Sequence, residues 1–245
     1  MGMRYGKPSI ASVFDDVKFW ANFPQEYARN GNWNNFYDAG QGLRIDQINS
    51  FSSTTNLPNL GTNFNCPNFN GSVYFRCSEA AGTKVDMAGG TTLVMWLKSF
   101  DMTERDTIFE KNGTNNNSYR QEIACTWETG ETISWYSRPG NYDYGSTASI
   151  GTNGDWKMVS IKMTTAKISG TNRAGYYSID GANYVQNYTA RSTDPPAQAG
   201  ELRMGTGYAG AVEGGSMSQC LVWDRELTNT EINQVWESTR SWHGR

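Results

Sequence analysis

Three carboxylates in the segment ERDTIFE have a spacing that would suit catalysis. Glycoside hydrolases use a pair of Asp or Glu side chains that flank the bond to be cleaved. Glu104, Asp106 and Glu110 are separated by even numbers of positions, so a regular strand would place all three on one face. The alternative is that they are solvated charges leading into a strand, and we favour it.

A second group, Tyr142, Asp143 and Tyr144, would suit sugar binding and lies close to Trp135 and Tyr136. Aromatic rings stack on the apolar faces of sugars, and a carboxylate accepts protons from hydroxyl groups. The alternative is that Trp135 belongs to the core and that the tyrosines pack within the loop or contact another protein. The Asn, Asp and Gly residues of this loop would offer oxygen atoms to Ca²⁺, but no regular Asp spacing supports a metal or cofactor.

The single histidine and the four cysteines do not form a pattern typical of a metal site or a triad. His243 lies near the C-terminal end, and a triad would need it buried beside a nucleophile, so we interpret it as a tail residue. Cys66, Cys77, Cys125 and Cys220 contain no C-x-x-C pair. We expect them to be buried, small apolar residues in a reducing compartment.

Charge and hydropathy argue against several classes of partner. The formal net charge of −3 is opposite to the basic surface that nucleic acid requires. The longest apolar run, 93–97, is too short to cross a membrane. No apolar segment follows the basic residues near the N-terminus, so we expect no signal peptide.

The elements that would position these residues are strands. Segment 91–100 is apolar on both faces, which is typical of a central strand covered on both sides. In 155–163 apolar and polar residues alternate, as in a half-buried strand. Asp180-Gly181 lies between aromatic and β-branched residues and predicts a tight hairpin with positive φ. Further strands are expected at 106–113, 118–128, 131–140, 201–207 and 216–224. Regularly spaced strands of this kind predict a β-sandwich or jelly roll.

One helix is expected near the C-terminus. Thr228 is a suitable N-cap, and Glu231 three residues later completes a capping box. Ile232, Val235 and Trp236 then form one apolar stripe. We expect this helix to lie over an edge of the sandwich, where it would cover unpaired strand groups.

The first part of the chain is rich in Asn and has weaker periodicity, with a strand expected within 12–21. We assign 1–64 to a leader packed on the sandwich and 65–245 to the jelly-roll domain. Large aromatic residues in the leader need a place to be buried, which favours an integrated segment. These residues are Phe14, Trp20, Trp33 and Phe36.

Five segments in order resemble laminin-G-like domains of the concanavalin-A-like jelly-roll superfamily: WLK, TIFEKNG, GDWKMVS, YYSIDG and VWDRELTNTEI. The resemblance covers about 72–239. It implies an all-β sandwich of two antiparallel sheets with one short C-terminal helix. The superfamily includes glucanases with an E-x-D-x-E or E-x-D-x-x-E signature. Glu110 lies beyond both spacings, roughly 6–7 Å farther along a strand than in the shorter one, so we expect no enzyme.

The N-terminal part, including KFWANFPQEYARNGNWNNFYDAG and NFNGSVYF, is similar to the leader of laminin-G-like virion proteins of tailed bacteriophages. This resemblance implies a non-enzymatic virion structural protein (a head decoration, fibre or tail component) located in the virion. Its partners would be other virion proteins and further copies of itself. The alternative is a carbohydrate-binding adhesin that contacts host glycans through Tyr142, Asp143 and Tyr144. A glycoside hydrolase is the third hypothesis.

Overall fold

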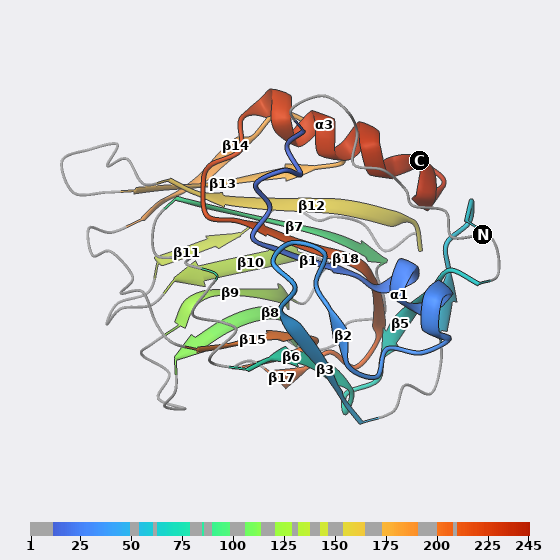
Figure 1. Cartoon of the computed structure of the whole chain (residues 1–245). Coiled ribbons are helices and arrows are strands. Elements are labelled where there is room, and N and C mark those ends of the chain that lie inside the picture. Colours follow the sequence, from blue (N-terminus) through green and yellow to red (C-terminus); the bar gives the residue numbers. More distant parts are fainter. Residues whose placement is uncertain are drawn as a thin grey trace.

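The computed structural model describes residues 12–49, 54–60, 63–78, 85, 90–98, 106–113, 121–128, 132–137, 143–146, 154–164, 173–190, 200–207 and 210–245. In these residues, two antiparallel sheets of eight strands each are stacked on one another (Figure 1). A short helix near the C-terminus lies on one of them. The predicted jelly-roll sandwich is confirmed.

One sheet, here called the β18 sheet, has the strand order β14-β13-β12-β7-β18-β5-β4, and β1 also pairs with β18. Its strands are β1 (Phe19–Asn22), β4 (Thr54–Asn56), β5 (Asn65–Phe69), β7 (Thr91–Lys98), β12 (Trp156–Met163), β13 (Arg173–Ile179), β14 (Val185–Ala190) and β18 (Gly215–Trp223).

The other sheet, here called the β8 sheet, has the order β11-β10-β9-β8-β15-β6-β3-β2. Its strands are β2 (Phe36–Tyr37), β3 (Arg44–Ile48), β6 (Tyr74–Cys77), β8 (Asp106–Gly113), β9 (Gln121–Glu128), β10 (Thr132–Ser137), β11 (Asp143–Ser146) and β15 (Gly200–Met204). A small ribbon is formed by β16 (Thr206–Gly207) and β17 (Gly210–Ala211). The helices are α1 (Phe23–Asn30), α3 (Asn229–Thr239) and the 3-10 helix η1 (Arg240–His243).

The central strand predicted at 91–100 is β7, between β12 and β18. Leu93, Met95 and Leu97 point into the core between the two sheets. Val94 and Trp96 point to the opposite face, where they belong to a second apolar cluster. Both faces of β7 are therefore buried, which explains why its sequence lacks the alternation of a half-exposed strand.

The second apolar cluster lies under α3. The predicted capping box is present, because Thr228 and Glu231 each bond to the other's backbone N–H. Ile232 and Val235 are fully buried against the outer face of the β18 sheet. The predicted position over a sandwich edge is wrong: α3 lies across the face of this sheet, because the apolar outer sides of β7 and β18 must be covered.

The hairpin predicted at Asp180-Gly181 is confirmed, with φ of 51° and 73° at these two residues. The Asp180 carboxylate accepts a hydrogen bond from the Met158 N–H at 3.0 Å, which ties the turn to β12. The Trp236 side chain packs so closely on Gly181 that a Cβ there would lie 2.4 Å from it. Glycine is needed for both reasons, positive φ and close approach.

Helix α1 was not predicted from the sequence. The strand expected within 12–21 is restricted to β1, which ends at Asn22 because this residue caps the helix. Its side chain accepts a hydrogen bond from the Gln25 N–H, and Pro24 stands in the first turn. Asn at the cap and Pro in the first turn are standard helix-start signals.

The residues before 65 contribute strands to both sheets: β1 and β4 to the β18 sheet, β2 and β3 to the β8 sheet. Phe14, Trp33 and Phe36 are buried, and Trp20 is half-buried. The division at residue 64 stays a prediction. No helix among the described residues is long and apolar enough to cross a bilayer.

Candidate functional site

Two of the three carboxylates of ERDTIFE are not solvated, contrary to the interpretation that the sequence favoured. Asp106 and Glu110 are buried in β8, and Glu104 lies outside the described residues. The reason is the β16–β17 ribbon, which passes so close over β8 that a Cβ at Gly207 would lie 2.0 Å from a Glu110 carboxylate oxygen. The Asp106 carboxylate accepts a hydrogen bond from the Glu213 N–H at 3.3 Å.

The predicted sugar-binding residues lie only partly within the described residues. Asp143 and Tyr144 begin β11, where they pair with Ser137 and Tyr136 of β10, and Tyr142 lies outside. Their role as ligand-binding residues stays a prediction. The neighbouring Trp135 is 1% exposed and belongs to the core between the sheets, as the alternative interpretation held.

His243 is a buried residue, and its interpretation as a tail residue is wrong. Its ring stacks on Trp96, with 3.7 Å between ring centroids and 2° between planes. Nε2 lies 2.5 Å from Ser218 Oγ, and Nδ1 lies 3.0 Å from the Thr239 carbonyl. Because a carbonyl can only accept, Nδ1 carries the proton and the Ser218 hydroxyl donates to Nε2.

This arrangement resembles a Ser–His pair, but both residues are buried, and neither lines the pocket described below. Burial lowers the pKa of His243 to about 3 and outweighs the hydrogen bond to Thr239, which favours the charged form. At neutral pH the imidazole is therefore neutral and a poor general base. We interpret His243 as the residue that fixes η1 to the sheet.

Cys66, Cys77 and Cys220 are buried with free thiols, in agreement with the predicted apolar role. Burial raises the pKa of the Cys66 and Cys77 thiols, so these two remain protonated and unreactive. In the parts of the chain that the structure describes, no three His, Cys, Asp or Glu side chains gather as metal ligands.

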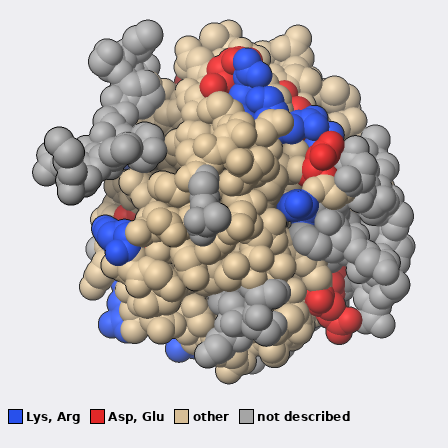
Figure 2. Space-filling model, turned by 90° about the vertical axis from the view of Figure 1, so that its right-hand side faces the viewer, with Lys and Arg blue, Asp and Glu red and all other residues tan. Residues whose placement is uncertain are grey.

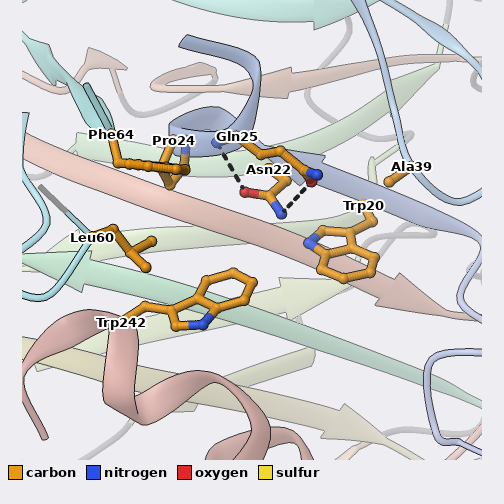
Figure 3. A pocket seen from close by; sticks show the side chains of 8 residues that line it. All are labelled: Trp20, Asn22, Pro24, Gln25, Ala39, Leu60, Phe64 and Trp242. Atoms are coloured by element: carbon orange, nitrogen blue, oxygen red, sulfur yellow. Dashed lines mark hydrogen bonds between the residues drawn. The ribbon is translucent and has the colours of Figure 1, made fainter. Parts of the chain in front are cut away.

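A pocket of about 230 Å³ on the outer side of the β18 sheet is the candidate functional site (Figure 3). It lies where β1, the start of α1, the segment between β4 and β5, and η1 meet. Its lining contains two tryptophans, three apolar side chains, two amides and one alanine. These residues are Trp20, Trp242, Pro24, Leu60, Phe64, Asn22, Gln25 and Ala39.

Trp20 is positioned by the alternation of β1. Phe19 and Ala21 point into the core between the sheets, so Trp20 and Asn22 point outward into the pocket. The Trp20 ring stacks on Phe14 at 5.3 Å between centroids. Its backbone N–H donates to Asp38, and its carbonyl accepts from the Ala39 N–H at 2.9 Å.

Asp38 organises the turn that holds β1. One carboxylate oxygen accepts the N–H groups of Trp20 (3.1 Å), Gly40 (2.7 Å) and Gln41 (3.1 Å). The other accepts the N–H of Leu43 at 2.5 Å. The side chain is 4% exposed. One buried carboxylate therefore fixes the turn that brings Ala39 to the pocket and also fixes the backbone of Trp20.

Trp242 comes from η1, at the other end of the chain, and lies across the cavity from Trp20 (Figure 3). The preceding residue, Ser241, accepts a hydrogen bond from the Asn59 side chain at 2.7 Å, and the following residue is the buried His243. Leu60, next to Asn59, lines the same pocket. The contacts of Ser241 and His243 therefore set the position of Trp242.

Some polar atoms in and beside the pocket form hydrogen bonds with each other, and others have no partner among the described residues. Asn22 and Gln25 bond to each other, with 3.2 Å between Asn22 Nδ2 and Gln25 Oε1, as the dashed lines of Figure 3 show. Gln219 pairs with Asn22 across β1 and β18. Both amide atoms of Gln219 and the Trp20 Nε1 are buried and have no hydrogen-bond partner among the described residues. A buried polar group without a hydrogen-bond partner destabilises the folded protein unless a partner is supplied.

A second hollow of about 350 Å³ adjoins the pocket and shares Trp20, Asn22, Gln25 and Ala39 with it. It adds one exposed tyrosine, one buried phenylalanine and three charged residues. These residues are Tyr37, Phe36, Glu26, Arg29 and Asp38. The two hollows, which share four lining residues, are here together called the Trp20 groove.

The described surface on the side of the molecule that carries α1 and η1 is mostly uncharged (Figure 2). Figure 2 shows the side of the molecule that carries α1 and η1, and most of it is formed by residues other than Lys, Arg, Asp and Glu. Acidic and basic residues gather side by side in its upper part. Among the described residues that this view shows, no large area of a single sign of charge is present to attract a charged partner.

This site was not predicted from the sequence, although two signals were available. The stretch Trp20-Ala21-Asn22-Phe23-Pro24 contains an outward-facing tryptophan directly before a cap and a first-turn proline. Trp242 comes after the helix with the capping box and lies beyond the apolar stripe of that helix, so the stripe does not account for it. Neither signal shows that the two tryptophans meet, because that depends on the packing of both ends of the chain.

No protein-family model matches the chain, and a search of curated protein sequences gives no match. Solved structures share its fold. A sialidase from Trypanosoma rangeli is 12% identical with a TM-score of 0.60 over 94% of this chain and 34% of its own. A structure of botulinum neurotoxin type C, whose cell entry is described as dependent on interaction with two ganglioside molecules, is 11% identical with a TM-score of 0.64 over 94% of this chain and 53% of its own.

Domain 4 of an extracellular arabinanase from Geobacillus stearothermophilus, in complex with arabinotriose, is similar over its whole length. The match has 12% identity and a TM-score of 0.56, and covers 90% of this chain and 98% of the domain. The chain spans about a third to a half of the length of the first two structures. At these identities the likeness establishes the fold, a lectin-like jelly-roll sandwich, and nothing further.

Proposed function

We propose that the protein is a carbohydrate-binding module that holds a glycan in the Trp20 groove. The observation that carries this proposal is the pair Trp20 and Trp242, which face each other across a pocket lined with amides. Indole rings supply flat apolar surfaces for sugar rings, and amides exchange hydrogen bonds with hydroxyl groups. The buried Trp20 Nε1 and Gln219 amide add polar atoms beside the same pocket.

The similar structures support the proposal through their ligands. The arabinanase domain is described in complex with arabinotriose, and cell entry of the neurotoxin is described as dependent on interaction with two ganglioside molecules. We propose the same class of ligand for this chain, in a binding role rather than a catalytic one. The virion structural role and location that the N-terminal resemblance implies stay predictions, because neither the fold nor the groove bears on them.

Replacing Ala39 with Trp tests the site without removing any packing. Ala39 is exposed and lines both hollows, so a large ring there fills the groove. We expect the variant to bind glycans at least about tenfold more weakly than the wild type, with an unchanged melting temperature. Binding is measured by glycan array and then by calorimetry with the best ligand.

Val185→Trp is the matched control, since Val185 is 50% exposed on β14 and lines neither hollow. It should bind as the wild type does. If Ala39→Trp also binds as the wild type does, the groove is not the site. Loss of binding in Tyr144→Ala instead would place the site at the loop predicted from the sequence.

A further inference from the structure

The charges of the Trp20 groove restrict the kind of sugar that it can hold. Each described residue that lines the pocket between Trp20 and Trp242 is uncharged. An anionic sugar, such as a sialic or uronic acid, needs a cation or an array of donors to replace the water that it loses on binding. The described lining holds no cation, the Asn22 NH₂ group already donates to Gln25, and the Trp20 Nε1 is buried, so this part of the pocket has few donors free for an anion.

The adjoining hollow does not supply a free cation. The Glu26 carboxylate is 6% exposed and accepts hydrogen bonds from Arg29, at 2.6 Å, and from Asn30. The Arg29 guanidinium is thus paired within its own helix. Asp38 contributes a second carboxylate to the lining. With two carboxylates and one guanidinium among its described lining residues, this hollow carries a net negative charge from them, which disfavours an anionic ligand.

Size and shape indicate how a ligand would lie. The pocket, at about 230 Å³, is smaller than the roughly 300–1,000 Å³ of sites for drug-sized molecules, so it suits a single sugar ring. The adjoining hollow continues past Trp20 to Tyr37, whose side chain is 61% exposed. An exposed ring at the rim of a hollow is a stacking surface for a second sugar.

We infer that the Trp20 groove selects uncharged oligosaccharides, with one sugar ring between Trp20 and Trp242 and the next ring on Tyr37. This inference rests on the proposed function and specifies its ligand.

The test compares matched oligosaccharides that differ only in a terminal acidic sugar, titrated into the whole protein. The uncharged members are expected to bind at least about tenfold more tightly than the acid-capped ones, with little dependence on NaCl concentration. Equal or tighter binding of the acid-capped members overturns the inference and leaves glycan binding intact. Absence of binding to any sugar overturns the proposed function as well.

A cation introduced at the rim tests the electrostatic argument. Gln25 is exposed in the first turn of α1 and lines both hollows. Gln25→Lys should improve binding of the acid-capped sugars several-fold at low salt, whereas Asn233→Lys, the same charge at an exposed position of α3, should not. Equal responses of the two variants would show that charge in the groove does not set the selectivity.

A variant of Tyr37 tests the second ring. Tyr37→Ala should weaken binding of a disaccharide about tenfold and leave monosaccharide binding unchanged. Since Tyr37 is exposed, its removal opens no cavity in the core. Equal losses for both ligands, or no loss for either, would refute the arrangement with two sugar rings.

Discussion

Replacing Asp38 with Asn is expected to lower the free energy of unfolding by about 3 kcal/mol. The carboxylate accepts four backbone N–H groups, and an amide can accept on one side only. Whichever way the amide is turned, its NH₂ group faces at least one N–H. In one orientation of the amide the Leu43 N–H is left without an acceptor, and in the other the Trp20 N–H is. Each buried N–H without an acceptor destabilises the folded protein by about 1–3 kcal/mol.

The measurement is urea unfolding of the variant beside the wild type and a control, Asp46→Asn. Asp46 is also an aspartate of the leader, but it is half-exposed and pairs with Arg44, an exposed ion pair. Such a pair contributes less than about 1 kcal/mol. We expect glycan binding to fall together with stability in the Asp38 variant, because its turn fixes Trp20 and Ala39. Equal stabilities of the two variants would contradict this role.

The second large effect is a loss of stability in acid that depends on His243. The pKa of this residue is about 3 in the folded protein and near its usual 6.5 in the unfolded chain. Between these values the unfolded chain binds a proton that the folded protein does not. Stability is therefore fully present above pH 6.5 and is lost as the pH falls towards 3. The loss attributable to this residue reaches about 4 kcal/mol.

His243→Phe removes the titrating group and keeps an aromatic ring to stack on Trp96. At neutral pH the variant should be about 1–2 kcal/mol less stable than the wild type, because the Ser218 hydroxyl loses its acceptor. As the pH falls this difference should shrink and then change sign, while carboxylates shared by both proteins titrate equally. A constant difference across the pH range would show that folding does not change the proton affinity of His243.

Elements whose signals lie within a few neighbouring residues could be predicted from the sequence. The hairpin at Asp180-Gly181 and the capping box at Thr228 and Glu231 are defined by local backbone needs. The central strand β7 could be predicted from its continuous apolar run. In each case the residue type that the local conformation requires is the one present.

The pocket could not be predicted in this way, because its parts are distant in sequence. Trp20 and Trp242 meet only after β1 pairs with β18 and α3 packs on the sheet. The burial of Glu110 and His243 has the same origin. Glu110 lies under the β16–β17 ribbon, and His243 belongs to η1, which packs on the outer face of the β18 sheet. Both positions follow from tertiary packing, which the residue types themselves do not indicate.

Strand β18 is close to the C-terminus, yet it lies in the middle of its sheet, between β7 on one side and β5 and β1 on the other. During synthesis, every earlier strand leaves the ribosome while this central position is still empty. The contacts of β18 with β1 span about 200 residues, a separation that makes folding slow. Until β18 is inserted, β7 exposes an apolar edge suited to pairing with other chains. The nascent chain therefore has its highest tendency to aggregate just before β18 becomes available for pairing.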